Sequence, residues 1–506
     1  MAKTIMLQGT SSHVGKSILT TALCRIFRQD GRAVVPFKAQ NMALNSYVTI
    51  DGEEMGRAQV AQAEAAGLAP LVEMNPVLLK PTGNSRSQVI LKGHPVGNMS
   101  AQEYHRDYSL KAFATIQECM GKLMQDYEVV VIEGAGSPAE VNLKDTDVVN
   151  MRIAKLVNAP VLLVADIDRG GALASVVGTI ELLDPDERDR IKGIVINKFR
   201  GDLELLKPAL TFLEEKTGKP VVGVVPHLAN LGIDDEDSVS LEDKKEKVGA
   251  ELDIVVLRTP KISNFTDFDP LAEEPDVNLR YVKMGEKIGR PDLIVLPGSK
   301  NTIEDLIALR QHGYDAEITA LADAGVPVIG ICGGYQMLGR TIKDPFHTES
   351  EAEEVEGLAL LDIETIFATE KLTQQVIADA QGNGFLNMQS AASGLTGYEI
   401  HMGRTEQGAG VESPFIITQR SQVKLRDNDG SLNSEGTVMG TYIHGIFDND
   451  EYRRGLLNML RKSKGLPVLP IGESTAARKQ ASYDRLAAVV RESLNMELVY
   501  SMMEAE

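Results

Sequence analysis

One stretch near the start of the chain constrains its fold more than any other, the segment GTSSHVGKS at residues 9–17. It follows an apolar run at residues 4–7 and opens a helical pattern that extends to about Gln29. This order of strand, glycine-rich turn and helix is the context that a phosphate-binding loop requires, because backbone N–H groups and the positive end of the helix stabilise phosphate oxygens. The alternative is a glycine turn before an ordinary helix. We interpret the segment as a nucleotide site.

Two side chains in this loop have expected roles. Lys16 would reach the outer phosphates of the nucleotide, and the Ser17 hydroxyl would bind Mg²⁺. The spacing departs from the common pattern, since five residues rather than four separate Gly9 from Gly15.

Composition narrows the class of protein. The 506 residues are 43% hydrophobic and 25% charged, as in ordinary globular proteins of two to four domains. The net charge of −20 argues against a nucleic-acid surface, which needs clustered Lys and Arg. Three cysteines provide no disulfide framework, the first apolar run is too short for a signal peptide, and no run is long enough for a membrane helix. We therefore expect a cytoplasmic protein with no membrane partner.

Short apolar strands alternate with helical stretches through the first part of the chain, which predicts a parallel, doubly wound sheet. The expected strands after the first one are residues 33–37, 128–132, 161–165, 193–196 and 221–225. Polar residues follow each strand at the same end, where ligands bind in open parallel sheets.

Two of these polar residues are candidates for binding the nucleotide or its metal ion. Lys38 could be a second phosphate or carboxylate contact, or a solvated loop lysine. Glu133 ends a strand beside the phosphate loop and is well placed to hold Mg²⁺; the alternative is a capping or turn carboxylate. A polar loop at residues 81–88 could contact an acidic substrate or simply form a turn.

A second α/β pattern begins after a stretch of mixed charge that we interpret as a linker. The predicted organisation is a nucleotide-binding domain at 1–228, a linker at 229–250, a second α/β domain at 251–450 and a helical extension at 451–506. In the second domain, strands are expected at residues 253–257, 293–296, 326–331 and 437–443.

The clearest chemical motif of the second domain is GICGGYQMLG at residues 330–339. A strand, a sharp glycine turn and a helix with Cys332 at the apex is the nucleophile-elbow pattern, with Cys in place of Ser. A position near a helix N-terminus favours the thiolate. The alternative is a buried structural thiol. The base that such a nucleophile needs must be close in space, and His444 and His401 are the candidates.

These motifs carry a resemblance over essentially the full length. The first part resembles the dethiobiotin synthetase group of phosphate-loop enzymes, and the second resembles the class I glutamine amidotransferases. In this order the pair is similar to the cobyric acid synthase family, glutamine-dependent amidating enzymes of cobalamin biosynthesis. The motifs that carry it are QGTSSHVGKS (8–17), FKAQNMALNS (37–46), LLKPTGNSRSQVILKG (78–93), ADIDRGGALASVVGT (165–179), NKFRGD (197–202), LPGSKNT (296–302), GICGGYQMLG (330–339), GYEIHMGR (397–404) and GTYIHGIFD (440–448).

The resemblance implies an α/β fold class with two doubly wound domains, an N-terminal phosphate-loop NTPase and a C-terminal class I glutamine amidotransferase-like (flavodoxin-like) domain. It implies amidation of the b, d, e and g carboxylates of adenosylcobyrinic acid a,c-diamide with ATP, Mg²⁺ and glutamine. The expected partners are these small molecules, and self-association into a homo-oligomer is left open.

The resemblance also implies roles for individual residues. Cys332 would be the glutaminase nucleophile and His444 its general base. Backbone N–H groups of Gly298 and Gly333 would form the oxyanion hole, and Gln336 would contact bound glutamine. The residues expected to bind ATP are Gly9, Thr10, Ser12, His13, Val14, Gly15, Lys16, Ser17, Lys38 and Asn197, the last at the base. The expected Mg²⁺ ligands are Ser17, Glu133 and Glu54.

One position departs from ordinary class I amidotransferases, which carry a Glu two residues after the histidine. Here that position is Ile446, so we expect no carboxylate in place to orient the imidazole and a Cys–His dyad instead of a triad. What fixes the tautomer of His444 is then an open question.

Two other functions are compatible with the motifs. The a,c-diamide-forming enzyme, or another glutamine-fed ligase, could share this architecture. A nucleotide-switch or partitioning-type ATPase is the alternative from a different class. The switch hypothesis predicts that the Cys332→Ala protein keeps its function. Many such switches use a second lysine next to the first glycine, but this chain has Thr10 at that position.

Overall fold

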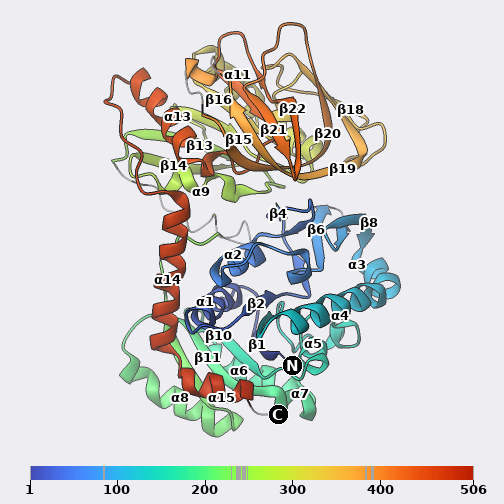
Figure 1. Ribbon diagram of the computed structural model, residues 1–506, viewed down its shortest axis with the longest axis vertical. Helices are drawn as coiled ribbons and strands as arrows, with labels where there is room; N and C mark the ends of the chain where they lie inside the picture. The colour runs from blue at the N-terminus through green and yellow to red at the C-terminus, as the bar shows by residue number, and fades with distance from the viewer. Residues whose placement is uncertain are drawn as a thin grey trace.

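The computed structural model describes residues 2–83, 86–229, 231–234, 241, 247, 249–381, 384–388 and 392–504. Figure 1 shows two α/β halves, one formed by the first part of the chain and one by the second, joined along one side by a long C-terminal helix. The predicted α/β class with two doubly wound units is confirmed.

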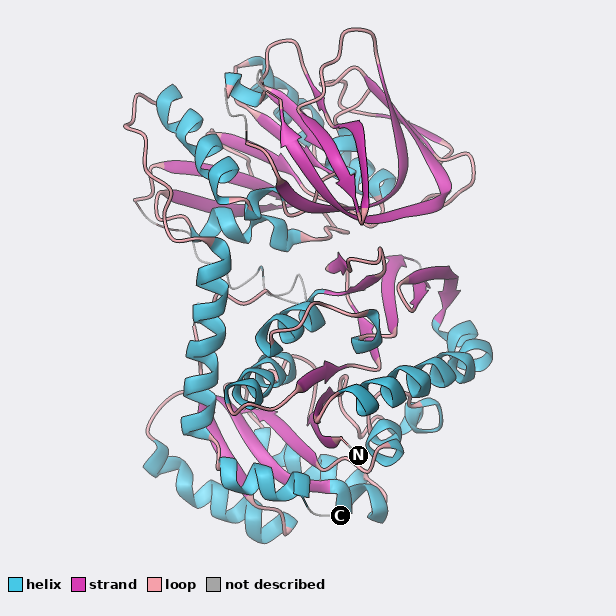
Figure 2. Cartoon of the chain, viewed as in Figure 1, coloured by secondary structure: helices cyan, strands magenta, loops and turns pink. Residues whose placement is uncertain are grey.

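The first half is built on a six-stranded parallel sheet in the order β12-β11-β10-β1-β9-β2. Its central strands β1 and β10 are buried except at Lys3, as expected for a sheet with helices on both faces (Figure 2). The strands are β1 Lys3–Gly9, β2 Val34–Phe37, β9 Val129–Glu133, β10 Val161–Asp166, β11 Ile191–Phe199 and β12 Val221–Pro226. The helices are α1 Lys16–Gln29, α2 Arg57–Ala66, α4 Ser109–Asp126, α5 Met151–Leu156, α6 Ala172–Leu182, α7 Pro185–Arg190 and α8 Leu203–Thr217.

Two small sheets extend this half toward the other one (Figure 1). A four-stranded sheet has the order β3-β6-β7-β8, and β4 pairs with β5. The strands are β3 Gln40–Met42, β4 Ser46–Val48, β5 Glu54–Gly56, β6 Val77–Gly83, β7 Arg86–Leu91 and β8 His94–Ser100. The expectation of a polar loop at 81–88 is therefore wrong in part. Its flanks are the paired ends of β6 and β7, while Asn84 and Ser85 lie outside the described residues.

The second half is built on a sheet in the order β14-β13-β15-β16-β24-β23, parallel except for the edge strand β23. The strands are β13 Leu252–Arg258, β14 Val277–Lys283, β15 Leu293–Leu296, β16 Val328–Ile331, β23 Ser431–Leu432 and β24 Val438–Thr441. The helices are α9 Asp269–Glu273, α10 Thr302–Gln311, α11 Tyr314–Asp323 and α12 Gly333–Met337.

A further sheet in this half, mainly antiparallel, was not predicted from the sequence. Its order is β18-β17-β19-β21-β22, and β20 also pairs with β19. The strands are β17 Thr341–Lys343, β18 Glu354–Glu356, β19 Ile363–Ala380, β20 Leu395–Gln407, β21 Phe415–Arg420 and β22 Val423–Asp429. In β19 buried residues alternate with partly buried ones only near the two ends. The middle of the strand is partly buried or exposed and mostly polar, so its pattern of apolar residues is weak.

The C-terminal helices connect the two halves. They are α13 Asp450–Ser463, α14 Thr475–Ser493 and α15 Met496–Glu504. Tyr483 and Val490 of α14 belong to the hydrophobic core of the first half, and Leu494 bridges to Gly223 of β12. The chain therefore returns to its N-terminal half after completing the C-terminal one.

The predicted linker lies largely outside the described residues, at 230, 235–240, 242–246 and 248. Asp234, which was expected to be solvated, is buried instead. Its carboxylate accepts a hydrogen bond from Arg57, and an ion pair of 2.7 Å joins the two side chains. A sequence pattern of charge alone could not show this pairing, since Arg57 is distant in the chain.

Candidate active site

The phosphate loop lies between β1 and α1, and its backbone requires glycine at two positions. Gly15 has φ 98°, and a Cβ there would come within 2.1 Å of Asn197 Nδ2. A Cβ on Gly9 would come within 2.7 Å of the Ser11 carbonyl oxygen. The loop is held from β11, where Asn197 donates to the Val14 carbonyl and Lys198 donates to the His13 carbonyl. Asn197 therefore lies beside the phosphate loop, with its amide nitrogen bonded to the loop backbone. Its expected contact with the nucleotide base stays a prediction.

Ser17, Lys38 and Glu133 are brought together beside this loop. Glu133 Oε1 accepts from the Ser17 hydroxyl at 2.8 Å and from Lys38 Nζ at 2.9 Å. Glu133 Oε2 accepts from Gln62 of α2 at 2.6 Å. Lys16 Nζ bonds the carbonyl oxygens of Ser11 and Gly136, so its ammonium group lies over the loop. The parallel strands thus deliver these groups to one edge of the sheet.

The Ser17 hydroxyl and the Glu133 carboxylate suit Mg²⁺, a hard cation that binds few protein oxygens and completes its shell with phosphate and water. Among the described residues, no group of three or more His, Cys, Asp or Glu side chains could hold a metal ion by itself. A metal here would therefore depend on the oxygens of a bound nucleotide.

Glu54, the third expected Mg²⁺ ligand, lies in a different environment. It is fully buried on β5, where Oε1 accepts from Lys80 and Oε2 from Lys371. Burial alone would raise the pKa of Glu54, but the two lysines lower it well below the usual range. A carboxylate already paired with two ammonium groups is a poor ligand for a further cation, so the structure argues against this expectation.

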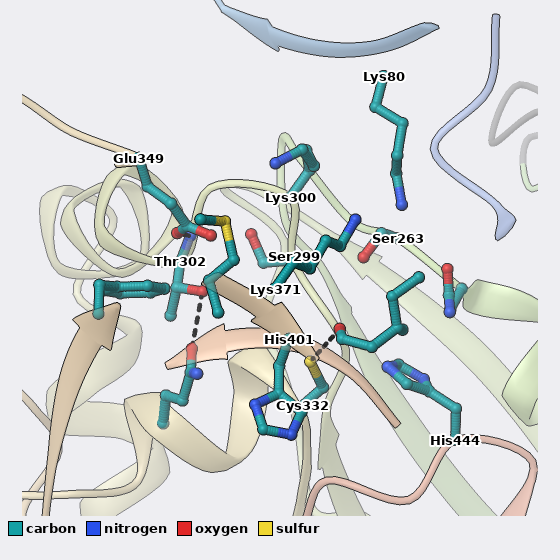
Figure 3. A pocket seen from close by; sticks show the side chains of 15 residues that line it. Lys80, Ser263, Ser299, Lys300, Thr302, Cys332, Glu349, Lys371, His401 and His444 are labelled. Carbon is teal, nitrogen blue, oxygen red and sulfur yellow. Dashed lines mark hydrogen bonds between the residues drawn. The ribbon is translucent and has the colours of Figure 1, made fainter. Parts of the chain in front are cut away.

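Cys332 lies at the turn between β16 and α12, in the elbow that the sequence predicts. Its φ of 51° and ψ of −106° are a strained conformation for a residue with a side chain. The turn packs tightly, since a Cβ on Gly334 would come within 2.0 Å of the Leu296 carbonyl oxygen. The Cys332 thiol contacts the Ile400 carbonyl oxygen at 3.6 Å (Figure 3).

His444 is the histidine that faces Cys332, and a carboxylate holds it. His444 Nδ1 lies 2.6 Å from Asp267 Oδ2, and Asp267 Oδ1 accepts from the Gly445 N–H. Burial alone would lower the pKa of His444, but the charge and hydrogen bond of Asp267 and the hydrogen bond to Cys332 raise it to about 10. The expectation that no carboxylate orients this imidazole is therefore wrong. Asp267, which is distant in the chain, takes that place.

Asp267 could not be found at the usual spacing, because it precedes His444 in the chain by most of the domain. It lies in a short 3₁₀ helix, η5 Phe265–Phe268, after β13. The ring of Tyr398 stacks on the other side of His444, with centroids 5.2 Å apart. The sequence signal for Asp267 was weak: a carboxylate in the segment that follows β13, a strand of the same sheet as β24, which precedes His444.

His401, the second histidine candidate, is engaged differently. Its Nδ1 lies 2.8 Å from the Gly403 carbonyl oxygen, and its ring stacks on Tyr442 with centroids 3.8 Å apart. These contacts suit a residue that lines the cavity at Cys332 better than they suit the general base.

The residues expected to form the oxyanion hole and the glutamine contact lie around the elbow. A Cβ on Gly298 would come within 3.1 Å of His444 Cε1, and one on Gly333 within 2.9 Å of the Ser299 nitrogen. Gln336 accepts from the Thr302 hydroxyl at 3.1 Å and donates to Tyr442 at 3.2 Å.

A cavity of about 40 Å³ opens at Cys332, and both halves of the molecule line it. Lys80 comes from the nucleotide-binding half, and the other lining residues come from the second half (Figure 3). The residues are Lys80, Ser263, Asn264, Ser299, Lys300, Thr302, Cys332, Gln336, Glu349, Phe367, Lys371, Ile400, His401, Met402 and His444. Sequence reasoning did not find the contribution of Lys80, because nothing in a sequence shows which domain surfaces meet.

Family models match both halves. Residues 5–240 match the CobQ/CobB/MinD/ParA nucleotide binding domain, and residues 253–452 match the CobB/CobQ-like glutamine amidotransferase domain. No helix among the described residues is both long and apolar enough to cross a membrane.

Relatives named cobyric acid synthase match over nearly the whole length. One from Pelotomaculum thermopropionicum is 56% identical, covering 99% of this chain and 97% of its own. Another, from Desulforamulus reducens, is 53% identical, covering 99% of this chain and 98% of its own. A third, from Moorella thermoacetica, is 53% identical, covering 100% and 98%.

Proposed function

The chain belongs to the cobyric acid synthase family of glutamine-dependent amidoligases in cobalamin biosynthesis, and on that premise we propose that it amidates the b, d, e and g carboxylates of adenosylcobyrinic acid a,c-diamide. The observation that carries this proposal is the shared cavity, in which a cysteine elbow of the amidotransferase half meets Lys80 of the nucleotide-binding half. Such a site can couple release of nitrogen to activation of a carboxylate.

Cys332 and His444 would release the nitrogen. The Cys332 thiolate attacks the side-chain amide carbon of glutamine, and the resulting oxyanion accepts hydrogen bonds from the N–H groups of Gly298 and Gly333. The His444 imidazolium donates its proton to the leaving nitrogen, which departs as ammonia. Neutral His444 then takes a proton from the water that hydrolyses the thioester, and glutamate leaves. Asp267 stabilises the imidazolium throughout.

The first half would activate the acceptor. A carboxylate oxygen attacks the γ-phosphorus of ATP, ADP leaves, and ammonia then displaces phosphate from the acyl phosphate to give the amide. Lys16 and the N–H groups of the loop offset charge on the transferred phosphoryl group. Ser17 and Glu133 would hold Mg²⁺, which supplies further positive charge at the phosphates when bound. Lys38 would contact the same phosphates, and Asn197 the base.

Ammonia released at Cys332 would pass to the acceptor without entering bulk water. At neutral pH free ammonia is largely protonated and therefore a poor nucleophile, so a shielded path preserves its reactivity. The position of the cavity between the two halves, with Lys80 of the first half in its wall, supports this proposal.

Mass spectrometry of the product tests the assignment. Purified protein is incubated with the a,c-diamide, ATP, Mg²⁺ and glutamine, and stepwise replacement of four hydroxyl groups by amino groups is expected. A second incubation uses the corrinoid that still has free carboxylates at a and c. Amidation of that compound at a and c, with no reaction of the a,c-diamide, would instead assign the a,c-diamide-forming reaction. ATP turnover without any amide product would contradict the proposed function.

A further inference from the structure

The cavity at Cys332 has a charged end that the reaction steps above do not use. Lys80, Lys300, Lys371 and Glu349 all line it. Figure 3 shows His401 and His444 beside Cys332, and Lys300 and Glu349 farther from it along the pocket. The cavity therefore joins a nucleophile at one end to a set of fixed charges at the other.

These charges are not equivalent, because two of the lysines already have a partner. Lys80 and Lys371 donate to the two oxygens of the buried Glu54. Lys300 makes no ion pair with any residue in the part of the chain that the structure describes, although the charge of Glu349 acts on it. Burial lowers the pKa of the Lys300 ammonium group. An anion bound beside Lys300 would therefore stabilise its charged form.

Glu349 is held in place by the start of α10. One of its carboxylate oxygens accepts from the Thr302 N–H at 2.8 Å, and its carbonyl oxygen accepts from Asn301. Burial raises the pKa of Glu349 to about 7, although the charge of Lys300 acts to lower it. A cation bound beside this carboxylate would restore its ionised form.

A glutamine molecule carries groups complementary to this lining. Its amide carbon must lie at Cys332, and its other end carries a carboxylate and an ammonium group on one carbon atom. We propose that Lys300 binds the α-carboxylate of glutamine and Glu349 binds its α-ammonium group, so that this pair selects the free amino acid over other amides. This inference rests on the proposed glutaminase role of the site.

Truncated amides test each contact separately. 4-Aminobutanamide lacks the α-carboxylate, and 4-carbamoylbutanoate lacks the α-ammonium group. Ammonia release from glutamine and from both analogues is measured with ATP and the corrinoid present. For Lys300→Met we expect kcat/KM for glutamine to fall about 10- to 100-fold, mainly through KM, with little change for 4-aminobutanamide. For Glu349→Gln we expect a comparable loss with glutamine and little change for 4-carbamoylbutanoate.

Lys261→Met is the matched control. The Lys261 carbonyl oxygen accepts from the Lys300 N–H at 2.9 Å, but the Lys261 side chain does not line the cavity. We expect the kinetics of Lys261→Met to equal those of the parent protein. We expect Lys300→Arg to keep part of the selectivity for glutamine that Lys300→Met loses.

Amidation with ammonium chloride in place of glutamine separates this inference from the proposed function. If Lys300→Met and Glu349→Gln keep ammonia-dependent amidation and lose selectivity as described, the inference holds. An equal loss for glutamine and both analogues would overturn it, because the residues would then only support the fold around Cys332. Failure of the parent protein to amidate the corrinoid even with ammonia would instead contradict the proposed function.

Discussion

Glu54 and Lys371 form a buried ion pair across the boundary between the two halves of the molecule. Glu54 lies on β5 of the nucleotide-binding half and Lys371 on β19 of the amidotransferase half. Lys80, which lines the cavity at Cys332, is bound to the same carboxylate at 2.8 Å. The contact that joins the two halves is therefore part of the wall of the glutaminase cavity.

Replacing Glu54 by Gln leaves two buried ammonium groups without a counter-charge. Loss of one partner from a buried pair costs about 3–5 kcal/mol. We expect the contact between the halves to weaken, so that thermal unfolding starts at a lower temperature. Differential scanning calorimetry measures this effect.

Glu204→Gln is the control for this substitution. Glu204 and Lys207 form an exposed ion pair on α8, and such pairs contribute about 0–1 kcal/mol. If both variants unfolded at the same temperature as the parent protein, the Glu54 pair would not hold the halves together.

Asp267→Asn tests the carboxylate that replaces the missing Glu after His444. The raised pKa of His444, about 10, means that the imidazolium is present below that pH and lost above it. Without the Asp267 charge the pKa of His444 falls, because burial lowers it and only the contact with Cys332 still raises it, so the imidazolium is lost at a lower pH than in the parent protein. We expect kcat/KM for glutamine to fall about 10³- to 10⁴-fold, with the alkaline limb of the pH profile moved to lower pH.

Ammonia-dependent amidation is the internal control for Asp267→Asn, since it bypasses Cys332 and His444. It should remain at the parent level. A variant with an unchanged pH profile for glutamine hydrolysis would show that Asp267 does not act through His444.

The sequence allowed us to predict the strands of the first parallel sheet, four strands of the second (β13, β15, β16 and β24), the phosphate loop and the cysteine elbow, because each depends on a local pattern. It did not allow us to predict the sheet of β17 to β22. Glycine at position 15 and the nucleophile turn at Cys332 are examples, since backbone geometry dictates the residue type there. Asp267, Lys80 and Glu54 could not be placed in the same way. Their partners are far away in the chain, and only the packing of separate loops and halves brings them into contact.

Glu133→Gln tests the proposed Mg²⁺ site. An amide has no charge to hold the cation beside Ser17, so we expect the Mg²⁺ concentration for half-maximal ATP hydrolysis to rise about 10- to 100-fold. Glu128→Gln is the control, because Glu128 precedes β9 at the opposite end of the strand, where it accepts from the Ala33 N–H. An unchanged Mg²⁺ dependence in Glu133→Gln would place the metal elsewhere.

Cys332→Ala separates an amidoligase from a nucleotide switch. Without the thiol no thioester forms, so we expect glutamine-dependent amidation to be lost while ammonia-dependent amidation remains. Product analysis with each nitrogen source checks this. Unchanged use of glutamine would exclude Cys332 as the nucleophile.

The shielded path for ammonia gives a prediction about the origin of the nitrogen in the product. With isotopically labelled glutamine and an excess of unlabelled ammonium in the medium, we expect the new amides to carry mainly the label, since the proposed path starts in the cavity that both halves line and keeps ammonia formed at Cys332 apart from the medium. Weakening the boundary by Glu54→Gln should raise the unlabelled fraction, while the exposed control Glu204→Gln should not. Mass spectrometry of the corrinoid reads both results. If the label were diluted in the parent protein to the proportion of free ammonia in the medium, ammonia would reach the acceptor through solvent and the proposed path would be wrong.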